Sequence, residues 1–168
     1  THNHLDHVDV DLIEEMNTDG IDFYAPTDCK ETLENLGVKG YNAFDMGSTV
    51  KIGNFEVEAV YADHTVPAIG VVVKHSGNTL YFTSDTLYNE KLAKVKCDIL
   101  FICINGKLGN MNVDEAIKIT KMISPKTAVP NHYDMFESNS EDPRKFKVEN
   151  SFVMEHNKEY EVKYGCLI

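Results

Sequence analysis

The sequence predicts one α/β domain built in layers, with a large antiparallel component, and three observations support this. The chain has 168 residues, and no repeat, low-complexity tract or Pro/Ser-rich linker divides it, so we expect a single domain over residues 1–168. Apolar and polar residues alternate over residues 41–83, which is the period of strands with one buried face. Beyond residue 85, helix-like and strand-like segments follow one another.

The first quarter of the chain predicts two short helices with a strand between them. Residues 10–16 carry apolar side chains at helical spacing, and this helix should end near Asp19-Gly20. Residues 21–25 are typical of a short strand. The pattern Asp28-x-x-Glu31 favours a capping box that opens a second helix, which should close at Gly37.

The remaining elements are predicted from period and turn residues. Gly47-Ser48, Gly53-Asn54 and Gly77-Asn78 mark turns within the run over residues 41–83, which predicts antiparallel strands. The elements expected after it are a helix over 89–95, a buried strand over 98–104, a helix capped by Asn112-x-x-Glu115 and running to about Ile123, a strand over 127–129, a helix start at 140–143 and a strand over 160–164.

Charge and cysteine content restrict the partners. Lys and Arg number 16 against 27 for Asp and Glu, so the net charge is −11, which would repel the backbone of a nucleic acid. The longest apolar runs fall well short of the roughly 18 residues of a membrane span, so we expect no membrane partner. The four cysteines are scattered and form no C-x-x-C, which favours a reducing, cytoplasmic location. The acidity could reflect bound cations, although solubility alone is the commoner reason.

The opening residues carry the sharpest chemical signal. His2, His4, Asp6 and His7 stand in the spacing H-x-H-x-D-H. Alternate residues of an extended segment point the same way, so His2 and His4 can share one ion. Asp6 and His7 stand where the chain turns toward a helix and can face a second ion. Neutral imidazoles and a carboxylate suit zinc, manganese or iron better than calcium.

Two later histidines and one aspartate follow predicted strands. Taken singly, His64 and His132 are more often surface or core residues, and Asp85 would serve as the N-cap of the next helix. Together with the opening motif they predict one metal centre, in which Asp85 is the carboxylate that bridges two ions. His75 and His156 have no such context, and we expect them to be structural.

These motifs resemble those of the metallo-β-lactamase superfamily, and more narrowly those of the bacterial L-ascorbate-6-phosphate lactonase group. The likeness lies in T-H-N-H-L-D-H-V-D-V at the start, S-D-T-L-Y around Asp85 and N-H-Y-D-M-F-E-S-N-S-E-D-P around His132. It covers nearly the whole chain. The metal motif is highly specific for the superfamily, whereas the motifs say little about the substrate.

The resemblance implies an α/β metallo-β-lactamase-like αββα sandwich holding two divalent ions, zinc or manganese, with iron as a further option. It implies one ion on His2, His4 and His64 and a second on Asp6, His7 and His132, with Asp85 between them. The family has several strands before its H-x-H-x-D-H segment, and this chain begins one residue ahead of it, so we expect a domain that lacks its N-terminal strands. The lactonase group also lacks an obvious histidine at the place of His64, where the wider superfamily has one.

The implied function is a dinuclear metal-dependent hydrolase of a small anionic substrate, a sugar lactone or ester that carries a phosphate. Two ions about 3.5–4 Å apart share one water and lower its pKa, so that a bridging hydroxide becomes the nucleophile. One ion stabilises the developing oxyanion and the other the leaving alkoxide. Asp6 is the expected catalytic residue, because it could also orient the water or accept its proton.

Three residues are expected to bind the substrate. Lys107 and Asn110 belong to a Gly-containing loop that could receive an anionic group, although an ordinary connector has the same composition. Tyr133, beside His132, could donate a hydrogen bond to the substrate, and a packed aromatic side chain is an equal alternative.

Two other functions remain open at this point. A phosphodiesterase of the same fold would use the same ions on a small phosphodiester. A non-catalytic, metal-binding fragment would use the ions to hold the fold. A homo-oligomer is a further option, because a missing first sheet would leave a strand edge and an apolar face for a second copy to cover.

Overall fold

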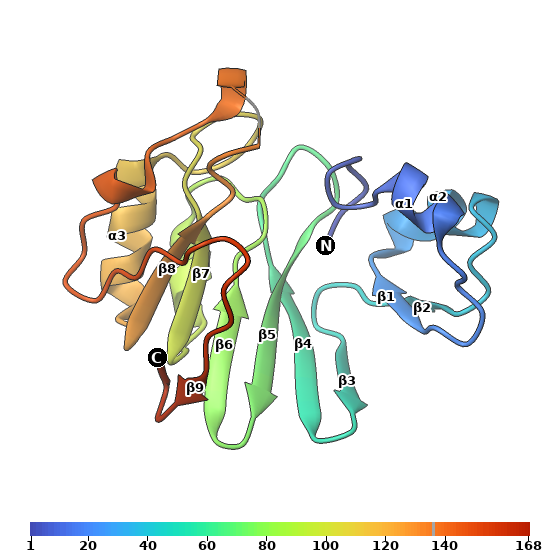
Figure 1. Cartoon of the computed structure of the whole chain (residues 1–168), viewed down its shortest axis with the longest axis horizontal. Helices are drawn as coiled ribbons and strands as arrows, with labels where there is room; N and C mark the ends of the chain where they lie inside the picture. The colour runs from blue at the N-terminus through green and yellow to red at the C-terminus, as the bar shows by residue number, and fades with distance from the viewer. Residues whose placement is uncertain (136) are drawn as a thin grey trace.

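Six strands form one mixed sheet at the centre of the computed structural model, which describes residues 1–135 and 137–168 (Figure 1). Their order across the sheet is the same as their order in the chain. Neighbours are antiparallel from β3 to β6, whereas β6–β7 and β7–β8 are parallel. The strands are β3 Thr49–Ile52, β4 Phe55–Tyr61, β5 Ile69–His75, β6 Asn78–Phe82, β7 Ile99–Cys103 and β8 Thr127–Asn131.

The connections account for this change of strand direction. Tight turns join β3 to β4 and β5 to β6, and in them Gly53 and Gly77 have φ angles of 57° and 78°, which glycine adopts without strain. Parallel strands need a crossover instead. The 3-10 helix η2 (Glu90–Lys94) lies between β6 and β7, and the helix α3 (Val113–Ile123) lies between β7 and β8. The carboxyl ends of β6, β7 and β8 therefore meet at one edge of the sheet.

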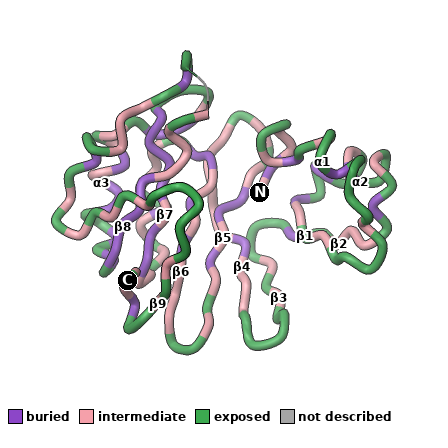
Figure 2. The backbone as a smooth tube through the Cα atoms, in the orientation of Figure 1, coloured by how far each residue is buried: buried purple, intermediate pink, exposed green. Residues whose placement is uncertain are grey.

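The main core lies where α3 packs on the parallel half of the sheet. All but one of the five residues of β7 are buried, which confirms the buried strand predicted from its apolar run. Helix α3 turns Ala116, Ile119 and Ile123 toward the same core. Figure 2 shows the buried residues concentrated in β7 and β8, while the far edge of the sheet at β3 is largely exposed. The edge at which β6, β7 and β8 end therefore borders the best-buried part of the sheet.

A small N-terminal unit packs beside the sheet and has its own apolar cluster (Figure 1). Its elements are α1 Val10–Glu15, β1 Phe23–Ala25, the 3-10 helix η1 Thr27–Cys29, α2 Lys30–Asn35 and β2 Tyr41–Ala43. β2 was expected to start the antiparallel run, but it pairs in parallel with β1 in a separate two-stranded sheet. The reason is that η1 and α2 cross between the two strands and bring the chain back in the same direction.

Three local expectations differ from the structure. The pattern Asp28-x-x-Glu31 does not form a capping box, because η1 precedes α2 and Cys29 occupies its N-cap without a side-chain hydrogen bond. Residues 89–95 contain the 3-10 helix η2 rather than an α-helix. The tail forms short 3-10 turns, η3 Glu137–Asn139 and η4 Pro143–Lys145, and a two-stranded hairpin, β9 Val162–Lys163 and β10 Cys166–Leu167.

The cysteines and the helices of the chain bear on two expectations from the sequence, the reduced thiols and the lack of a membrane span. All four cysteines are free thiols, and burial raises the pKa of Cys103 to about 11, so its thiol behaves as a small apolar group. Within the part of the chain that the structure describes, no helix has both the length and the apolar character needed to cross a membrane.

The structure confirms the capping box predicted at the N-terminus of α3. The Asn112 side chain accepts from the N–H of Glu115, and the Glu115 carboxylate accepts from the N–H of Asn112, both at 3.0 Å. Replacing Asn112 with Ala should lower the free energy of unfolding by about 1 kcal/mol, because a helix-end N–H loses its acceptor. Urea denaturation measures this change. Asn112→Asp keeps an acceptor and should stay near the wild type, so equal losses in both variants would contradict the capping role.

Candidate metal centre

The segment that carries the opening motif is held against the sheet. The carbonyl of Thr1 accepts a hydrogen bond from the N–H of Ile69, the first residue of β5, at 3.0 Å. The carbonyl of His4 accepts from the N–H of His7 at 2.9 Å, which folds the segment into a turn. His2 is fully buried as a result. The motif is therefore fixed by backbone hydrogen bonds rather than carried on a loose end.

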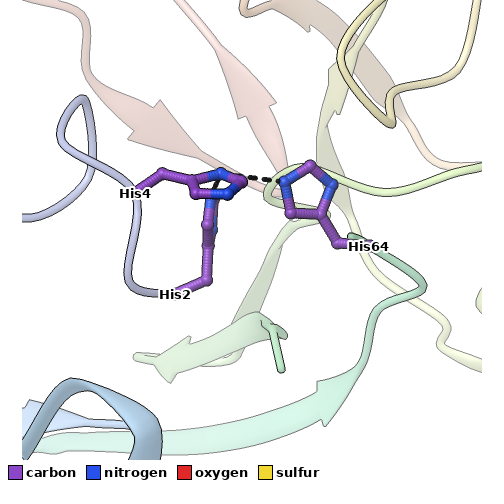
Figure 3. A group of neighbouring side chains, drawn as sticks. All are labelled: His2, His4 and His64. Atoms are coloured by element: carbon purple, nitrogen blue, oxygen red, sulfur yellow. Dashed lines mark hydrogen bonds between the residues drawn. The ribbon is translucent and has the colours of Figure 1, made fainter. Parts of the chain in front are cut away.

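Three imidazole rings converge on one point (Figure 3). His2 and His4 come from the N-terminal segment, and His64 comes from the loop between β4 and β5. His4 Nδ1 lies 3.1 Å from His2 Nε2 and 3.2 Å from His64 Nε2. On its other side, the His64 ring donates from Nδ1 to the carbonyl of Gly109 at 3.0 Å, which leaves Nε2 unprotonated and directed at the cluster.

The donor chemistry of this cluster fits a metal ion. Two nitrogens that each lie about 2.0–2.1 Å from a tetrahedral ion are about 3.3 Å apart, close to the separations seen here. Burial, together with the neighbouring His7, lowers the pKa of His2 to about 3. His2 is therefore neutral at physiological pH and keeps the nitrogen lone pair that a ligand needs.

A second cluster joins two carboxylates with two imidazoles. His132 Nε2 lies 3.1 Å from Asp85 Oδ1 and 3.4 Å from Asp6 Oδ2. His7 Nε2 lies 3.3 Å from the same oxygen of Asp85 and 3.6 Å from that of Asp6. The four ligand atoms fall within 4.8 Å of one another, so a single ion could contact all of them.

The outer nitrogens of these two rings also have partners. The hydroxyl of Thr1 lies 3.0 Å from His7 Nδ1, and the side-chain amide of Asn105 lies 3.1 Å from His132 Nδ1. Such contacts orient a ring and select the nitrogen that faces the ion. His132 itself has a φ angle of 52°, a left-handed backbone that is strained for a side chain of this size. Neither Thr1 nor Asn105 was among the residues expected from the sequence.

Asp85 connects the two clusters. Its Oδ1 faces His7 and His132, while its Oδ2 lies 3.9 Å from Nε2 of His64 in the first cluster. Burial raises the pKa of Asp85, but the His7 ring, the Asn110 amide and the His132 charge outweigh burial and lower it to about 2. Asp85 Oδ1 is buried without a well-formed hydrogen bond among the described residues. An ionised, buried oxygen of this kind suits a cation.

Asn110, which was expected to bind the substrate, forms hydrogen bonds to Asp85 and to the backbone of Thr86. Its amide donates to Asp85 Oδ2 at 2.9 Å, and its oxygen accepts from the N–H of Thr86 at 3.0 Å. Asn110 is nearly fully buried, so both of its polar groups are used inside the protein. The loop pattern indicates a polar residue at this position but not the direction in which its side chain points.

The other two residues expected to contact the substrate, Lys107 and Tyr133, make contacts within the protein. Lys107 Nζ donates to the carbonyl of Ser138 at 2.7 Å and does not line the pocket in front of the clusters. Tyr133 packs against the main core, and burial raises the pKa of its hydroxyl. This packing favours the alternative of a packed aromatic side chain for Tyr133.

A pocket of about 600 Å³ opens in front of both clusters. Four of the predicted ligands line it, and we call them its inner wall. Apolar residues that the sequence did not point to also line it, and we call Leu5, Leu108 and Met135 its outer wall. The lining residues are His4, Leu5, Asp6, Thr65, Asp85, Leu108, Gly109, His132 and Met135. The candidate ligands can therefore be reached by a small molecule from solvent. His75, expected to be structural, stacks on Phe55 at the other end of the sheet.

Comparison with known proteins bears on this arrangement. Residues 1–133 match the model of the family described as beta-lactamase superfamily domain. A UPF0173 metal-dependent hydrolase of Staphylococcus aureus is 29% identical over 166 residues, a match that covers 88% of this chain and 72% of that protein.

Solved structures show the same fold. Igni18, a metallo hydrolase from the archaeon Ignicoccus hospitalis, has a TM-score of 0.76 and 25% identity over 92% of this chain and 74% of that one. An isothiocyanate hydrolase from Delia radicum gut bacteria has a TM-score of 0.73 over 91% of this chain and 71% of that one, but only 16% identity. The second likeness concerns the fold alone.

A substitution at Gly109 tests whether the orientation of the His64 ring matters for metal binding by the first cluster. Gly109 has a φ angle of 83°, and a Cβ at this position would lie 2.8 Å from His64 Nδ1. Gly109→Ala should displace the His64 ring and weaken zinc binding by about 10- to 100-fold, as expected when a contact that orients a ligand is lost. Competition with a chromophoric chelator measures the affinity.

Gly77→Ala is the matched control. Gly77 has a similar φ angle of 78°, but nothing lies within 4 Å of its added Cβ. Both variants should lose stability from backbone strain, and only Gly109→Ala should lose zinc affinity. An equal loss of affinity in the two variants would show that strain, not the His64 ring, is responsible.

Proposed function

Because the chain belongs to the beta-lactamase superfamily domain family and is a metal-dependent hydrolase with the metallo-β-lactamase fold, we propose that it uses two divalent ions to cleave a small lactone or ester. The observation that carries this proposal is Asp85, which reaches both ligand clusters from one buried position. A single structural ion would not require two complete ligand sets joined by one carboxylate. The proposed ligands are His2, His4 and His64 for one ion, and Asp6, His7 and His132 for the other, with Asp85 between them.

The proposed ions are zinc or manganese, with iron as a further option. Five imidazoles and two carboxylates form the donor set, and this mixture suits all three metals. When bound, two such ions supply an activated water and polarise the scissile carbonyl. The protein's own part is to hold the ligands, to admit the substrate and to move the proton.

Asp6 is the proposed proton acceptor. It lines the pocket, and its carboxylate keeps about a third of its surface exposed, whereas that of Asp85 is almost fully buried. Asp6 can therefore meet both a ligand ring and a water that enters with the substrate. As water adds to the carbonyl carbon, the C–O bond to the alcohol breaks and the proton reaches the leaving oxygen through Asp6. The products are an acid and an alcohol, joined in one molecule when the substrate is a lactone.

The choice of a lactone or ester comes from the resemblance to the ascorbate-6-phosphate lactonase group. The phosphate of such a substrate was expected to be received by Lys107, whose amine is engaged by Ser138. Among the described residues, no lysine or arginine lines the pocket. The proposed substrate is therefore a lactone or ester without a phosphate group.

Metal content tests the two-ion proposal. The purified chain should contain about two ions, measured by inductively coupled plasma mass spectrometry. Asp85→Ala should lower this content sharply, because both clusters lose a shared carboxylate. The control Asp22→Ala removes an exposed acid outside the clusters and should leave the content unchanged. Fewer than half an ion per wild-type chain would overturn the proposal and favour a fragment without a working centre.

Rates of hydrolysis of two test compounds distinguish a lactonase or esterase from a phosphodiesterase and from a non-catalytic protein. A chromogenic lactone should be hydrolysed faster than bis-p-nitrophenyl phosphate, and Asp6→Asn should lower kcat on the lactone by about 10²- to 10⁴-fold, the usual contribution of a general base. Preference for the phosphodiester would make the chain a phosphodiesterase of the same fold. A metal-loaded protein inert to both compounds would favour a non-catalytic role.

A further inference from the structure

The pocket in front of the clusters has two chemically distinct walls. The inner wall carries His4, Asp6, Asp85 and His132. The outer wall carries Leu5, Leu108 and Met135, which come from segments far apart in the chain. The fold therefore brings these apolar side chains together from separate segments, and they do not belong to one apolar stretch of sequence.

The two leucines of this wall are unusually open to solvent. Leu5 is 76% exposed and Leu108 is 65% exposed. Leu108 also has a φ angle of 54°, a conformation that costs a leucine energy and that Gly or Asn would adopt more easily. Neither solvation nor local backbone geometry favours leucine at this position. An apolar ligand that covers the side chain gives a physical reason for it.

The charges on the pocket lining also favour an uncharged arm. Among the described residues of the lining, the charged side chains are Asp6 and Asp85, whose charge two bound divalent ions would offset, and no lysine or arginine lies beside the apolar residues. The whole chain carries a net charge of −11. The nearest loop lysine, Lys107, is bonded to the carbonyl of Ser138. An anionic substituent on the outer wall would meet apolar side chains and no cation, so it would lose its hydration without compensation.

We propose that the outer wall binds an uncharged hydrocarbon arm of the substrate, which makes the substrate a neutral ester or lactone with an apolar acyl or alkoxy group. This inference rests on the proposed function for the place of the reacting carbonyl, which lies against the inner wall. Leu5 and Leu108 contact the arm from either side, and Met135, a flexible thioether, adapts to its length. The pocket volume of about 600 Å³ suits a small molecule rather than a polymer.

Chain-matched esters test the proposal. The purified protein should hydrolyse p-nitrophenyl hexanoate with a kcat/KM at least about tenfold higher than p-nitrophenyl acetate, because each buried methylene contributes about fourfold. It should also prefer the hexanoate at least about tenfold over mono-p-nitrophenyl adipate, which has the same chain length and ends in a carboxylate. Equal kcat/KM values for hexanoate and adipate would overturn the proposal.

Binding of unreactive amides tests the apolar arm site independently of catalysis. In methyl-labelled protein, hexanamide should shift the NMR signals of Leu5, Leu108 and Met135, and adipamic acid at the same concentration should not. If no ester is hydrolysed but these shifts appear, the proposed function fails and the apolar arm site stands. If esters are hydrolysed but neither compound moves these three signals, the apolar arm site fails alone.

Leu108→Asn supplies the matched variant. Asn tolerates the left-handed backbone and removes the apolar surface, so the fold should be kept. The ratio of its kcat/KM on the hexanoate to that on the acetate should fall by about fourfold or more relative to the wild type. Leu12→Asn, which changes a 55% exposed leucine on α1 that does not line the pocket, should not alter this ratio. Equal losses on hexanoate and acetate in Leu108→Asn would count against the arm site.

Discussion

The arrangement of the site depends on one buried carboxylate. A charge removed from water is costly unless other groups compensate it, and Asp85 is compensated from three sides. Asn110 holds one oxygen, while His7 and His132 face the other. The position of Asp85 is set in turn by the end of β6, where Ser84 takes a left-handed backbone with a φ angle of 58° and turns the next side chain toward the clusters.

The residue after Asp85 joins the loops around it. The hydroxyl of Thr86 accepts from the N–H of Asp63, next to His64, and its carbonyl accepts from the N–H of Met111, next to Asn110. Thr86 is fully buried, so these bonds are shielded from water. The loop with His64, the loop with Asp85 and the loop with Asn110 are therefore tied at one point, and the ligand clusters share a single framework.

The sequence predicted the parts of this arrangement that depend on local pattern. The opening motif, the buried run of β7 and the cap of α3 each involve residues close together in the chain, and each can be read from spacing. The parallel pairing of β1 and β2 could not be predicted, because it depends on how η1 and α2 redirect the chain. The sequence pattern also did not show which polar side chains are buried or where they point. For this reason Asn110 was expected to contact the substrate, and the contact of Asn105 with His132 was not expected.

The distance in sequence between the ligands has a consequence for folding. In the second cluster, Asp6 and His132 are separated in the chain by all six strands of the main sheet. A partly folded form without β8 could not present the second ligand set, so an ion held there would bind only after the sheet is complete. Ion binding then adds to the stability of the whole chain according to the free ion concentration and its dissociation constant. The proposed second ion would therefore stabilise only chains in which the N-terminal segment and β8 have already come together.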